Sequence, residues 1–392
     1  MKKIENFRPL SISMLIGYDS ASDRCAVGEY GERLLKILPA DQKNIKFYFK
    51  RVIFKPRSVV DWFRVQDVIG GASIVHIQYP FEAWGNSPFP GVLALVVKRV
   101  SQIKGPISVV TTFHEWHGMH WMRRLSVFPL AYFSDMLIFV SRRERDAYGK
   151  SLIGRLRGNR QLRHIIPISS NVNVPVIDRA SVATERATIL GGQSERREIL
   201  LGFFGFIYDW KQPYKLLSII KELRNDGINA KLLICGDFPD GHEDQRAKFW
   251  LTVAELGIEH CVIHKGYVED EVLLAHMLAA CDAHLYLYKD GLSSRRGSFW
   301  YSMKLGVRVI CTPPRYSGEF DGLIDLDKLV DAGDIRFVEP NSSIEDLVSV
   351  AKNLADFRIP TKASAEPPDW NMIADLHHVA YENLLEKGAA IK

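Results

Sequence analysis

The sequence predicts an α/β protein built from two doubly wound domains, and three observations support this prediction. The chain has 392 residues, about two to three times the usual length of one domain. Short apolar segments alternate with longer amphipathic segments, which is typical of helices wound around parallel sheets. This alternation occurs twice, and a polar stretch that contains Gly191 and Gly192 separates the two series.

Each series contains short, β-rich apolar segments that we interpret as parallel strands. In the first series we expect strands at Leu10–Ile16, Ile45–Phe49, Ile74–Ile77, Ile107–Thr111, Met136–Val140 and His164–Ile168. In the second series we expect them at Ile199–Phe204, Lys231–Ile234, Val262–His264, Ala283–Leu287, Val309–Cys311 and Ile335–Val338.

The same pattern sets the expected domain limits. We predict a first domain over residues 1–178, a linker over 179–198, a second domain over 199–365 and a C-terminal segment over 366–392 that forms one amphipathic helix or two. Ligands of doubly wound sheets bind beyond the carboxyl ends of the strands. Functional residues are therefore expected in the turns that follow strands.

Composition excludes several classes of protein. The hydrophobic fraction of 47% and charged fraction of 25% argue against a disordered or coiled-coil chain. No apolar run approaches the ~20 residues of a membrane span, and none near the N-terminus predicts a signal peptide. Five scattered cysteines favour a reducing, cytoplasmic location over disulfides or a zinc site. The sequence lacks the glycine motifs of ordinary nicotinamide, flavin and P-loop enzymes.

The net charge of +5 is unevenly distributed. Residues 141–163 contain eight Arg or Lys residues and two acidic residues, so their excess of positive charge is larger than that of the whole chain. Two interpretations stay open: an anionic partner binds near this segment, or the segment is a solvated basic loop. Nucleic acid is not expected, because the sequence has no recognised nucleic-acid-binding module.

Two turns of the first half contain candidate ligand residues. Gly28 follows the first strand at the expected start of a helix, where small residues let backbone N–H groups approach an anion or simply close a turn. His114 follows the strand Ile107–Thr111 and is a candidate for contact with a substrate hydroxyl. His117 is a weaker candidate, since a metal site of the two histidines would lack a third ligand.

In the second half, Gly205 and Lys211 follow the first strand. Gly205 would permit close backbone approach, and a lysine at a helix start opposes the helix dipole unless an anionic ligand lies between them. A solvated lysine is the alternative interpretation.

The segment Asp290–Phe299 provides the most specific signal. Its hydroxyls, arginines and glycine precede a helix, where guanidinium groups and free N–H groups together suit a phosphate or diphosphate. The candidate residues are Ser293, Ser294, Arg295, Arg296, Gly297 and Ser298.

In their order along the chain, these motifs resemble those of GT-B glycosyltransferases, in particular the retaining family 4. In the first half, CAVGEYGERLL, IVHIQYP, VVTTFHEW and MLIFVSRRERD are similar to motifs of that family. In the second half the resemblance is carried by FFGFIYDWKQPYKLLSIIKEL, KLLICGDF, VIHKGYVEDEVLLAHMLAACDAHLYLY and GSFWYSMKLGVRVICT. The resemblance covers nearly the whole chain and implies two Rossmann-like domains that face a central cleft.

The resemblance also implies roles for the residues. Lys211, Arg295 and Arg296 would neutralise the diphosphate of a nucleotide-sugar donor without a metal or other cofactor, and backbone near Tyr267 and Val268 would hold the base. Gly28 would border the donor diphosphate from the first domain. His114 would contact the hydroxyls of the transferred sugar. The first domain would bind a glycan or lipid-linked acceptor of bacterial surface polysaccharide biosynthesis, and the C-terminal helix would return to this domain.

One departure from the family pattern concerns two glutamates. The family usually has glutamates eight positions apart, one facing the donor sugar and one holding the ribose, and this chain has Ser293 and Tyr301 there. It resembles instead a branch with the pattern SxRRG. The departure keeps alternatives open: a non-catalytic nucleotide-sugar-binding relative or partner subunit, or a GT-B epimerase or phosphorylase.

Aromatic and cationic residues after the fourth predicted strand suggest a membrane surface. The stretch HEWHGMHWMRRLSVFPLAYF, together with Trp84 and the basic segment, resembles an interfacial surface for the anionic inner face of a membrane. The alternative is a buried helix with one charged edge.

Overall fold

A computed structural model describes residues 10–17, 26–38, 47–54, 69, 71–79, 84, 89–192, 198–354 and 366–390, and every structural statement refers to these residues. By their internal contacts the residues form two units. Unit 1 comprises Met1–Asn171 and Pro368–Lys392, and unit 2 comprises Val172–Pro367. Each unit is described by itself.

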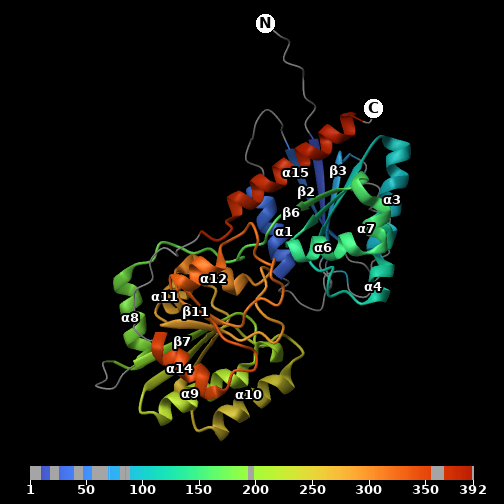
Figure 1. Ribbon diagram of the computed structural model, residues 1–392. Helices are drawn as coiled ribbons and strands as arrows, with labels where there is room; N and C mark the ends of the chain where they lie inside the picture. The colour runs from blue at the N-terminus through green and yellow to red at the C-terminus, as the bar shows by residue number, and fades with distance from the viewer. Residues whose placement is uncertain are drawn as a thin grey trace. The chain divides into compact units, whose positions relative to one another are not determined.

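Unit 1 alternates strands and helices along the chain (Figure 1). Its elements are β1 (Leu10–Gly17), α1 (Ala26–Ile37), β2 (Phe47–Phe54), β3 (Ile74–Tyr79), α3 (Phe89–Lys104), β4 (Ser108–Phe113), α4 (Trp121–Ser126), α5 (Phe128–Phe133), β5 (Met136–Phe139), α6 (Arg142–Lys150), α7 (Leu152–Arg157), β6 (Leu162–Ile165) and α15 (Trp370–Ala390).

The strands of unit 1 form a parallel sheet in the order β2-β1-β3-β4-β5-β6. Alternate side chains of the same strands enter two different apolar clusters. Leu15 and Val109 belong to one cluster with residues of α3 and α5, whereas Ile16 and Val110 belong to the other with residues of α1 and α15. Helices therefore cover both faces of the sheet, as in a doubly wound fold.

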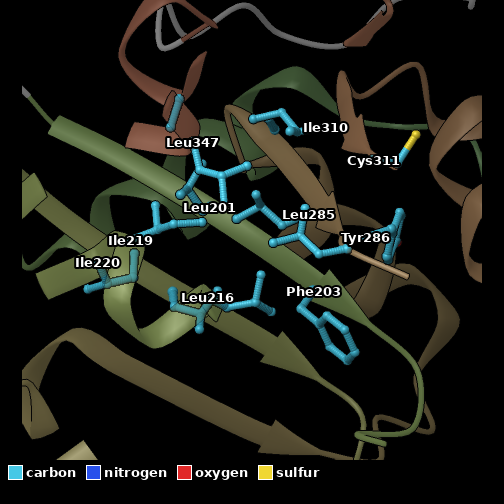
Figure 2. Packing of buried hydrophobic residues seen from close by; sticks show 14 of the residues in the cluster. Leu201, Phe203, Leu216, Ile219, Ile220, Leu285, Tyr286, Ile310, Cys311 and Leu347 are labelled. Carbon is cyan, nitrogen blue, oxygen red and sulfur yellow. The ribbon is translucent and has the colours of Figure 1, made fainter. Parts of the chain in front are cut away.

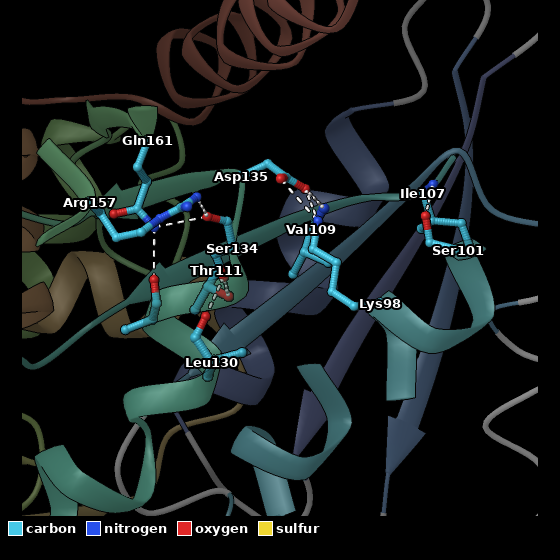
Figure 3. A network of polar contacts seen from close by, with 11 residues as sticks. Lys98, Ser101, Ile107, Val109, Thr111, Leu130, Ser134, Asp135, Arg157 and Gln161 are labelled. Carbon is cyan, nitrogen blue, oxygen red and sulfur yellow. Dashed lines mark hydrogen bonds and ion pairs between the residues drawn. The ribbon is translucent and has the colours of Figure 1, made fainter. Parts of the chain in front are cut away.

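Polar contacts stabilise unit 1 near the amino ends of β4 and β5 (Figure 3). Asp135, which precedes β5, accepts hydrogen bonds from Lys98 Nζ on α3 at 2.8 Å and from the backbone N–H of Val109 at 2.8 Å. Nearby, the hydroxyls of Thr111 and Ser134 lie 2.8 Å apart. These contacts join α3, β4 and the loop that precedes β5.

Unit 2 repeats the alternation. Its elements are α8 (Arg179–Leu190), β7 (Glu198–Phe204), α9 (Pro213–Asn225), β8 (Asn229–Cys235), α10 (Glu243–Glu255), β9 (Val262–Gly266), α11 (Glu271–Ala279), β10 (Ala283–Tyr286), α12 (Gly297–Leu305), β11 (Val309–Cys311), α13 (Leu326–Asp331), β12 (Ile335–Phe337) and α14 (Ile344–Leu354).

The strands of unit 2 are all parallel and lie in the order β12-β11-β10-β7-β8-β9. Leu201 and Phe203 of β7 pack with Leu285 of β10 and with Leu216 and Ile220 of α9 (Figure 2). A second cluster on alternate residues of the strands packs against α8, α11 and α12. From β7 the strands continue to β8 and β9 on one side, and the chain then returns to add β10, β11 and β12 on the other side, so the topological switch point of this sheet lies between β7 and β10.

The residues expected to form a linker are largely a helix. Helix α8 occupies residues 179–190, because Asp178 caps its start by accepting from the Ser181 N–H at 2.8 Å and Gly191 ends it in the left-handed conformation. Arg186 of this helix forms an ion pair of 3.0 Å with the buried Asp282. The boundary between the two units therefore lies before this helix, between Asn171 and Val172.

The fold class predicted from sequence is confirmed for both units. Each predicted strand overlaps one of β1–β12. The predicted residues Ile45 and Lys46 lie outside the described residues, and β2 extends further, to Phe54. The strand predicted at His164–Ile168 was placed too late, since β6 runs from Leu162 to Ile165. The C-terminal segment forms the single helix α15, which contacts α1 of unit 1. Within the described part of the chain, no helix is both long and apolar enough to span a bilayer.

Candidate functional site

Gly205, Lys211 and the loop of Ser293–Ser298 follow the carboxyl ends of β7 and β10, at the switch point of the sheet of unit 2. Two hydrogen bonds join the loops that follow these strands: Lys289 N–H donates to Trp210 O at 2.8 Å, and Gln212 Nε2 donates to Leu287 O at 3.0 Å. Gln212 has a φ of 52°, a left-handed conformation that costs energy for a residue with a side chain. Tertiary contacts therefore impose the path of this loop.

Lys211 is a buried cation without an anionic partner. Its side chain is 7% exposed, and within the described residues it forms no hydrogen bond or ion pair. Its Nζ instead lies 5.1 Å from the ring centroid of Phe203 and 5.3 Å from that of Trp210. Burial, and secondarily the charge of Arg296, lower the pKa of Lys211 from 10.5 to about 7. A buried lysine in this state is stabilised by a ligand that brings negative charge.

Glycines bring backbone close to Lys211. A Cβ placed on Gly205, whose φ is +102°, would lie 3.4 Å from Lys211 Nζ and 3.9 Å from Ser298 Cβ. A Cβ on Gly236, whose φ is +148°, would lie 2.2 Å from Gly205 O. The end of β7, the end of β8 and the start of α12 therefore meet beside the lysine. The 2.2 Å distance leaves no room for a Cβ at Gly236, and the positive φ favours glycine at Gly205.

Arg296 adds a second positive charge at the start of α12. Its guanidinium lies 4.2 Å from the ring centroid of Trp210 and 4.9 Å from that of Tyr288, and it forms an ion pair of 2.7 Å with Asp290. Arg296 is also the N-cap residue of α12, which starts at Gly297 without a side-chain cap. The free N–H groups of this first turn and the two cations together suit an anion.

Glu319, which no motif of the sequence indicates, supports the serines of the same loop. This residue is 2% exposed, and its Oε1 accepts from Ser293 Oγ at 2.9 Å, from Ser294 N–H at 3.0 Å and from Ser294 Oγ at 2.8 Å. Its Oε2 is buried and has no hydrogen-bond partner. No motif spacing identifies Glu319, because it reaches the loop only through the fold.

The other predicted residues of unit 2 lie near this loop or at the end of β9. Arg295 Nε lies 3.4 Å from Ser293 Oγ. Tyr267 is 55% exposed and, with the half-buried Val268, follows β9. Tyr301 is fully buried against Phe204, with ring centroids 4.9 Å apart, and its hydroxyl has no partner.

In unit 1, His114 lies immediately beyond β4. It is 6% exposed, its Nε2 lies 3.0 Å from Gln78 Oε1, and its ring contacts Tyr30 edge to face with centroids 5.4 Å apart. Gly28 lies in the first turn of α1, the helix that follows β1. Both residues are thus at the carboxyl end of the sheet of unit 1, as the sequence predicted.

The loop after His114 is held by a buried carboxylate that the sequence analysis did not identify. Glu144 is 1% exposed and accepts from the backbone N–H groups of Trp116 at 2.5 Å and His117 at 2.6 Å. His117 itself is exposed. In the described ranges no group of three or more His, Cys, Asp or Glu residues is arranged to hold a metal ion.

The aromatic set predicted near this loop divides into two parts. Trp84, Trp116 and Met119 are buried in the core of unit 1, whereas Trp121 and Met122 of α4 are 67% and 58% exposed. The basic segment 141–163 is mostly helical, in α6 and α7, so its interpretation as a loop was wrong. Of its arginines, Arg157 and Arg163 stack on tyrosine rings.

Comparison with known proteins identifies similar folds. No family model and no curated protein sequence matches the chain. HepE from Anabaena, solved in complex with UDP and glucose, superposes with a TM-score of 0.65 and 14% identity, covering 96% of this chain and 100% of that one. Sucrose-phosphate synthase from Thermosynechococcus elongatus gives 0.60 and 16%, covering 96% and 100%. A glycosyltransferase from Rickettsia africae gives 0.59 and 11%, covering 98% of each chain.

At these identities the similarity establishes the architecture and not the activity. The superposed proteins span essentially their whole length on this chain, so both units and their order are shared. The two parallel, doubly wound sheets, with the candidate residues at their carboxyl ends, therefore constitute the GT-B fold that the sequence analysis expected.

Proposed function

We propose that the protein is a retaining glycosyltransferase that moves a sugar from a nucleoside diphosphate donor to a glycan or lipid-linked acceptor. The observation that carries this proposal is Lys211: a buried cation without a counter-charge, beside Arg296 and the uncapped start of α12. A diphosphate supplies the missing negative charge, and its departure from the sugar requires neutralisation at these same oxygens. HepE is described in complexes with UDP and with UDP-glucose, which makes UDP-glucose the first donor to test.

Each candidate residue has a proposed role at the donor. Lys211 acts as a compact charge, and Arg295 and Arg296 as planar donors that can bind two phosphate oxygens each. The N–H groups from Gly297 onward and Ser298 add neutral donors. The remaining residues would surround the nucleoside and sugar: Gly28, Gly205, Tyr267, Val268, Ser293, Ser294 and Tyr301.

In the proposed reaction the leaving phosphate takes the proton of the acceptor hydroxyl on the same face of the sugar. Retention then needs no enzyme nucleophile, while His114 binds a hydroxyl of the sugar and orients it. Lysine and arginine supply the positive charge that a metal would otherwise supply. We therefore expect transfer to continue in excess EDTA, and a loss that Mg²⁺ or Mn²⁺ restores would contradict metal independence.

The test is transfer and donor hydrolysis with UDP-glucose, with the anomeric configuration of the product followed by proton NMR. Lys211→Met and Arg295→Ala are each expected to lower turnover by on the order of 10²-fold or more. Lys248→Met is the matched control, because Lys248 is exposed on α10 and stacks on Tyr214. Unchanged turnover in both site variants would refute the diphosphate assignment.

The same assay separates the alternative functions. A non-catalytic nucleotide-sugar-binding protein would bind UDP-glucose and release neither sugar nor UDP. An epimerase would release UDP and a free sugar of altered configuration without any acceptor. A product with the opposite anomeric configuration would leave glycosyl transfer in place and remove the retaining mechanism.

We also propose that the acceptor side of unit 1 contacts an anionic membrane face. Helix α4 contacts α5 and α5 contacts α7, and apolar side chains on this group are exposed: Trp121 at 67%, Leu125 at 66%, Leu152 at 72% and Leu156 at 58%. Exposed cations of the basic segment, such as Arg155, lie on the same helices.

Vesicle sedimentation tests this membrane contact. Binding to vesicles that contain phosphatidylglycerol is expected to fall in Trp121→Glu and in Leu152→Glu. Leu251→Glu is the control, since Leu251 is an exposed leucine of unit 2. Absence of wild-type binding at low salt would refute the contact and would leave the donor site unaffected.

A further inference from the structure

A continuous series of buried polar side chains connects the C-terminal helix α15 to His114. The hydroxyl of Tyr381 on α15 lies 2.7 Å from Nδ1 of His76. Nε2 of His76 lies 3.3 Å from Nε2 of Gln78, and Oε1 of Gln78 lies 3.0 Å from Nε2 of His114. Tyr381, His76 and Gln78 are 0% exposed, so no bulk solvent competes with these contacts.

Helix α15 also contacts His114 indirectly, through aromatic rings. Trp370, the first residue of α15, packs on Tyr30 with ring centroids 5.2 Å apart, and Tyr30 contacts His114 edge to face. Trp370 is itself held by a hydrogen bond of 2.7 Å from its Nε1 to Ser170 O. The C-terminal helix therefore restrains the position of His114 by packing and by hydrogen bonding.

The positions of the protons on His76 and Gln78 follow from which of their atoms can donate and which can accept. Burial, with the neighbouring His377 and His114, lowers the pKa of His76 well below its ordinary value, so His76 is neutral. A neutral imidazole has one donor and one acceptor nitrogen, whereas an amide nitrogen only donates and an amide oxygen only accepts. With this orientation of the Gln78 amide, Gln78 Nε2 donates to His76 Nε2, which also lies 2.8 Å from Thr112 Oγ1, and His76 Nδ1–H then donates to the hydroxyl of Tyr381.

The oxygen of the Gln78 amide determines which ring nitrogen of His114 carries the proton. Because Gln78 Oε1 only accepts, Nε2 of His114 must be the nitrogen that carries the proton. Nδ1 of a neutral His114 is then the acceptor nitrogen. A sugar hydroxyl that binds at Nδ1 would have to donate its proton to the ring.

We propose that Gln78 is a positioning residue that holds His114 in the Nε2–H tautomer, and that His76 and Tyr381 of α15 fix the orientation of the Gln78 amide. This inference rests on the proposed function in one respect, since the hydroxyl that His114 orients belongs to the donor sugar. The tautomer itself is a property of the free protein.

The direct test is nitrogen-15 NMR of the full chain labelled at histidine, at about pH 7.5 and without ligand. The His114 signals are assigned by their loss in His114→Gln. The expected result is a protonated Nε2 and a non-protonated Nδ1. The opposite tautomer would overturn the proposal, because it requires the reversed Gln78 amide.

A charge variant and a matched control extend the test. In Gln78→Glu the carboxylate lies beside His114 Nε2–H, and the pKa of His114 is expected to rise by about one unit or more. Thr112→Val removes the other partner of His76 Nε2, which lies at 2.8 Å, and is expected to leave the tautomer of His114 unchanged. An unchanged His114 titration in Gln78→Glu would overturn the proposal.

The two proposals fail in different ways. If the Nε2–H tautomer is found, the pKa of His114 rises in Gln78→Glu and UDP-glucose does not bind, the proposed function fails and the role of Gln78 stands. If UDP-glucose is turned over and His114 is the Nδ1–H tautomer, only the role of Gln78 fails. In the expected case, Gln78→Glu lowers kcat for UDP-glucose by about tenfold and leaves the affinity for UDP unchanged, since UDP has no sugar to orient.

Discussion

Lys211 links donor binding to the uptake of a proton, and this linkage is a direct test of the proposed diphosphate site. Burial and Arg296 lower the pKa of the free lysine from 10.5 to about 7. A diphosphate beside Nζ would raise this pKa again. Between about pH 7 and about pH 9 the lysine is therefore increasingly neutral in the free protein and charged in the complex, so binding takes up a proton.

The size of the effect follows from the pKa of the free site. Affinity that requires a protonated group falls about tenfold per pH unit above that pKa. From about pH 7 to about pH 9, the Kd for UDP-glucose is expected to rise on the order of 50-fold. UDP-glucose is the suitable ligand because its diphosphate does not titrate in this range.

Calorimetric titration in two buffers of different ionisation enthalpy measures the proton directly. At about pH 8 we expect an uptake of about 0.9 proton per UDP-glucose bound. Lys211→Arg keeps its charge at every pH and is expected to remove the uptake, while Lys211→Met removes it and also weakens binding near pH 7. Uptake that persists in Lys211→Met would refute the assignment of the proton to Lys211.

Stability without ligand provides an independent measurement of the same group. A lysine whose pKa is lower in the folded than in the unfolded state destabilises the protein, fully below the folded pKa and progressively less as pH rises from about 7 to 10.5. The difference corresponds to at most about 5 kcal/mol. Lys211→Met is expected to raise the free energy of unfolding at about pH 6, and Lys248→Met is expected to leave it unchanged.

Three further predictions concern residues of unit 2. Glu319→Ala leaves the donors of Ser294 unsatisfied and is expected to lower the free energy of unfolding by about 2–4 kcal/mol in urea, whereas Glu319→Gln keeps an acceptor and is expected to cost about 1 kcal/mol. Gly236→Ala places a Cβ 2.2 Å from Gly205 O and is expected to weaken UDP binding at least about tenfold in a titration, a prediction that fails if affinity is unchanged. Asp282→Asn leaves its arginine partner without a counter-charge and is expected to lower the free energy of unfolding by about 3 kcal/mol, and an unchanged urea midpoint would contradict this.

The strands could be predicted from the sequence because a parallel sheet is buried on both faces. Such strands are nearly continuous apolar runs, and β10 and β11 were found by this pattern alone. Helix α8 was missed although Asp178 and Gly191 are ordinary capping residues. Its apolar positions are few, since only Val182, Ile189 and Leu190 are buried, and a polar helix of this kind has the composition of a linker.

The candidate site could be predicted where the residues follow strands and could not where the fold brings distant segments together. Gly205, Lys211 and Arg296 lie in turns after strands, so the topology of parallel sheets locates them. Glu319 reaches the loop of Ser294 from 25 residues away in the sequence, without a spacing rule that would connect the two. The sequence likewise does not show that Trp116, in the loop after β4, is buried while Trp121, at the start of α4, is exposed.

Glu319 bears on the absence of the two glutamates that the resembled family has in this region. Ser293 stands where the resembled family has a glutamate near the donor sugar, yet the loop still contains a carboxylate, because Glu319 accepts from the Ser293 hydroxyl at 2.9 Å. Its Oε1 accepts from the hydroxyls of both Ser293 and Ser294, so this carboxylate is engaged within the fold. Tyr301, at the second position, is buried against Phe204 and supplies no carboxylate for a ribose. In the proposed function, a nucleotide-sugar donor would therefore meet arginines in this loop where the resembled family has a carboxylate, and we expect it to bind through its diphosphate more than through its ribose.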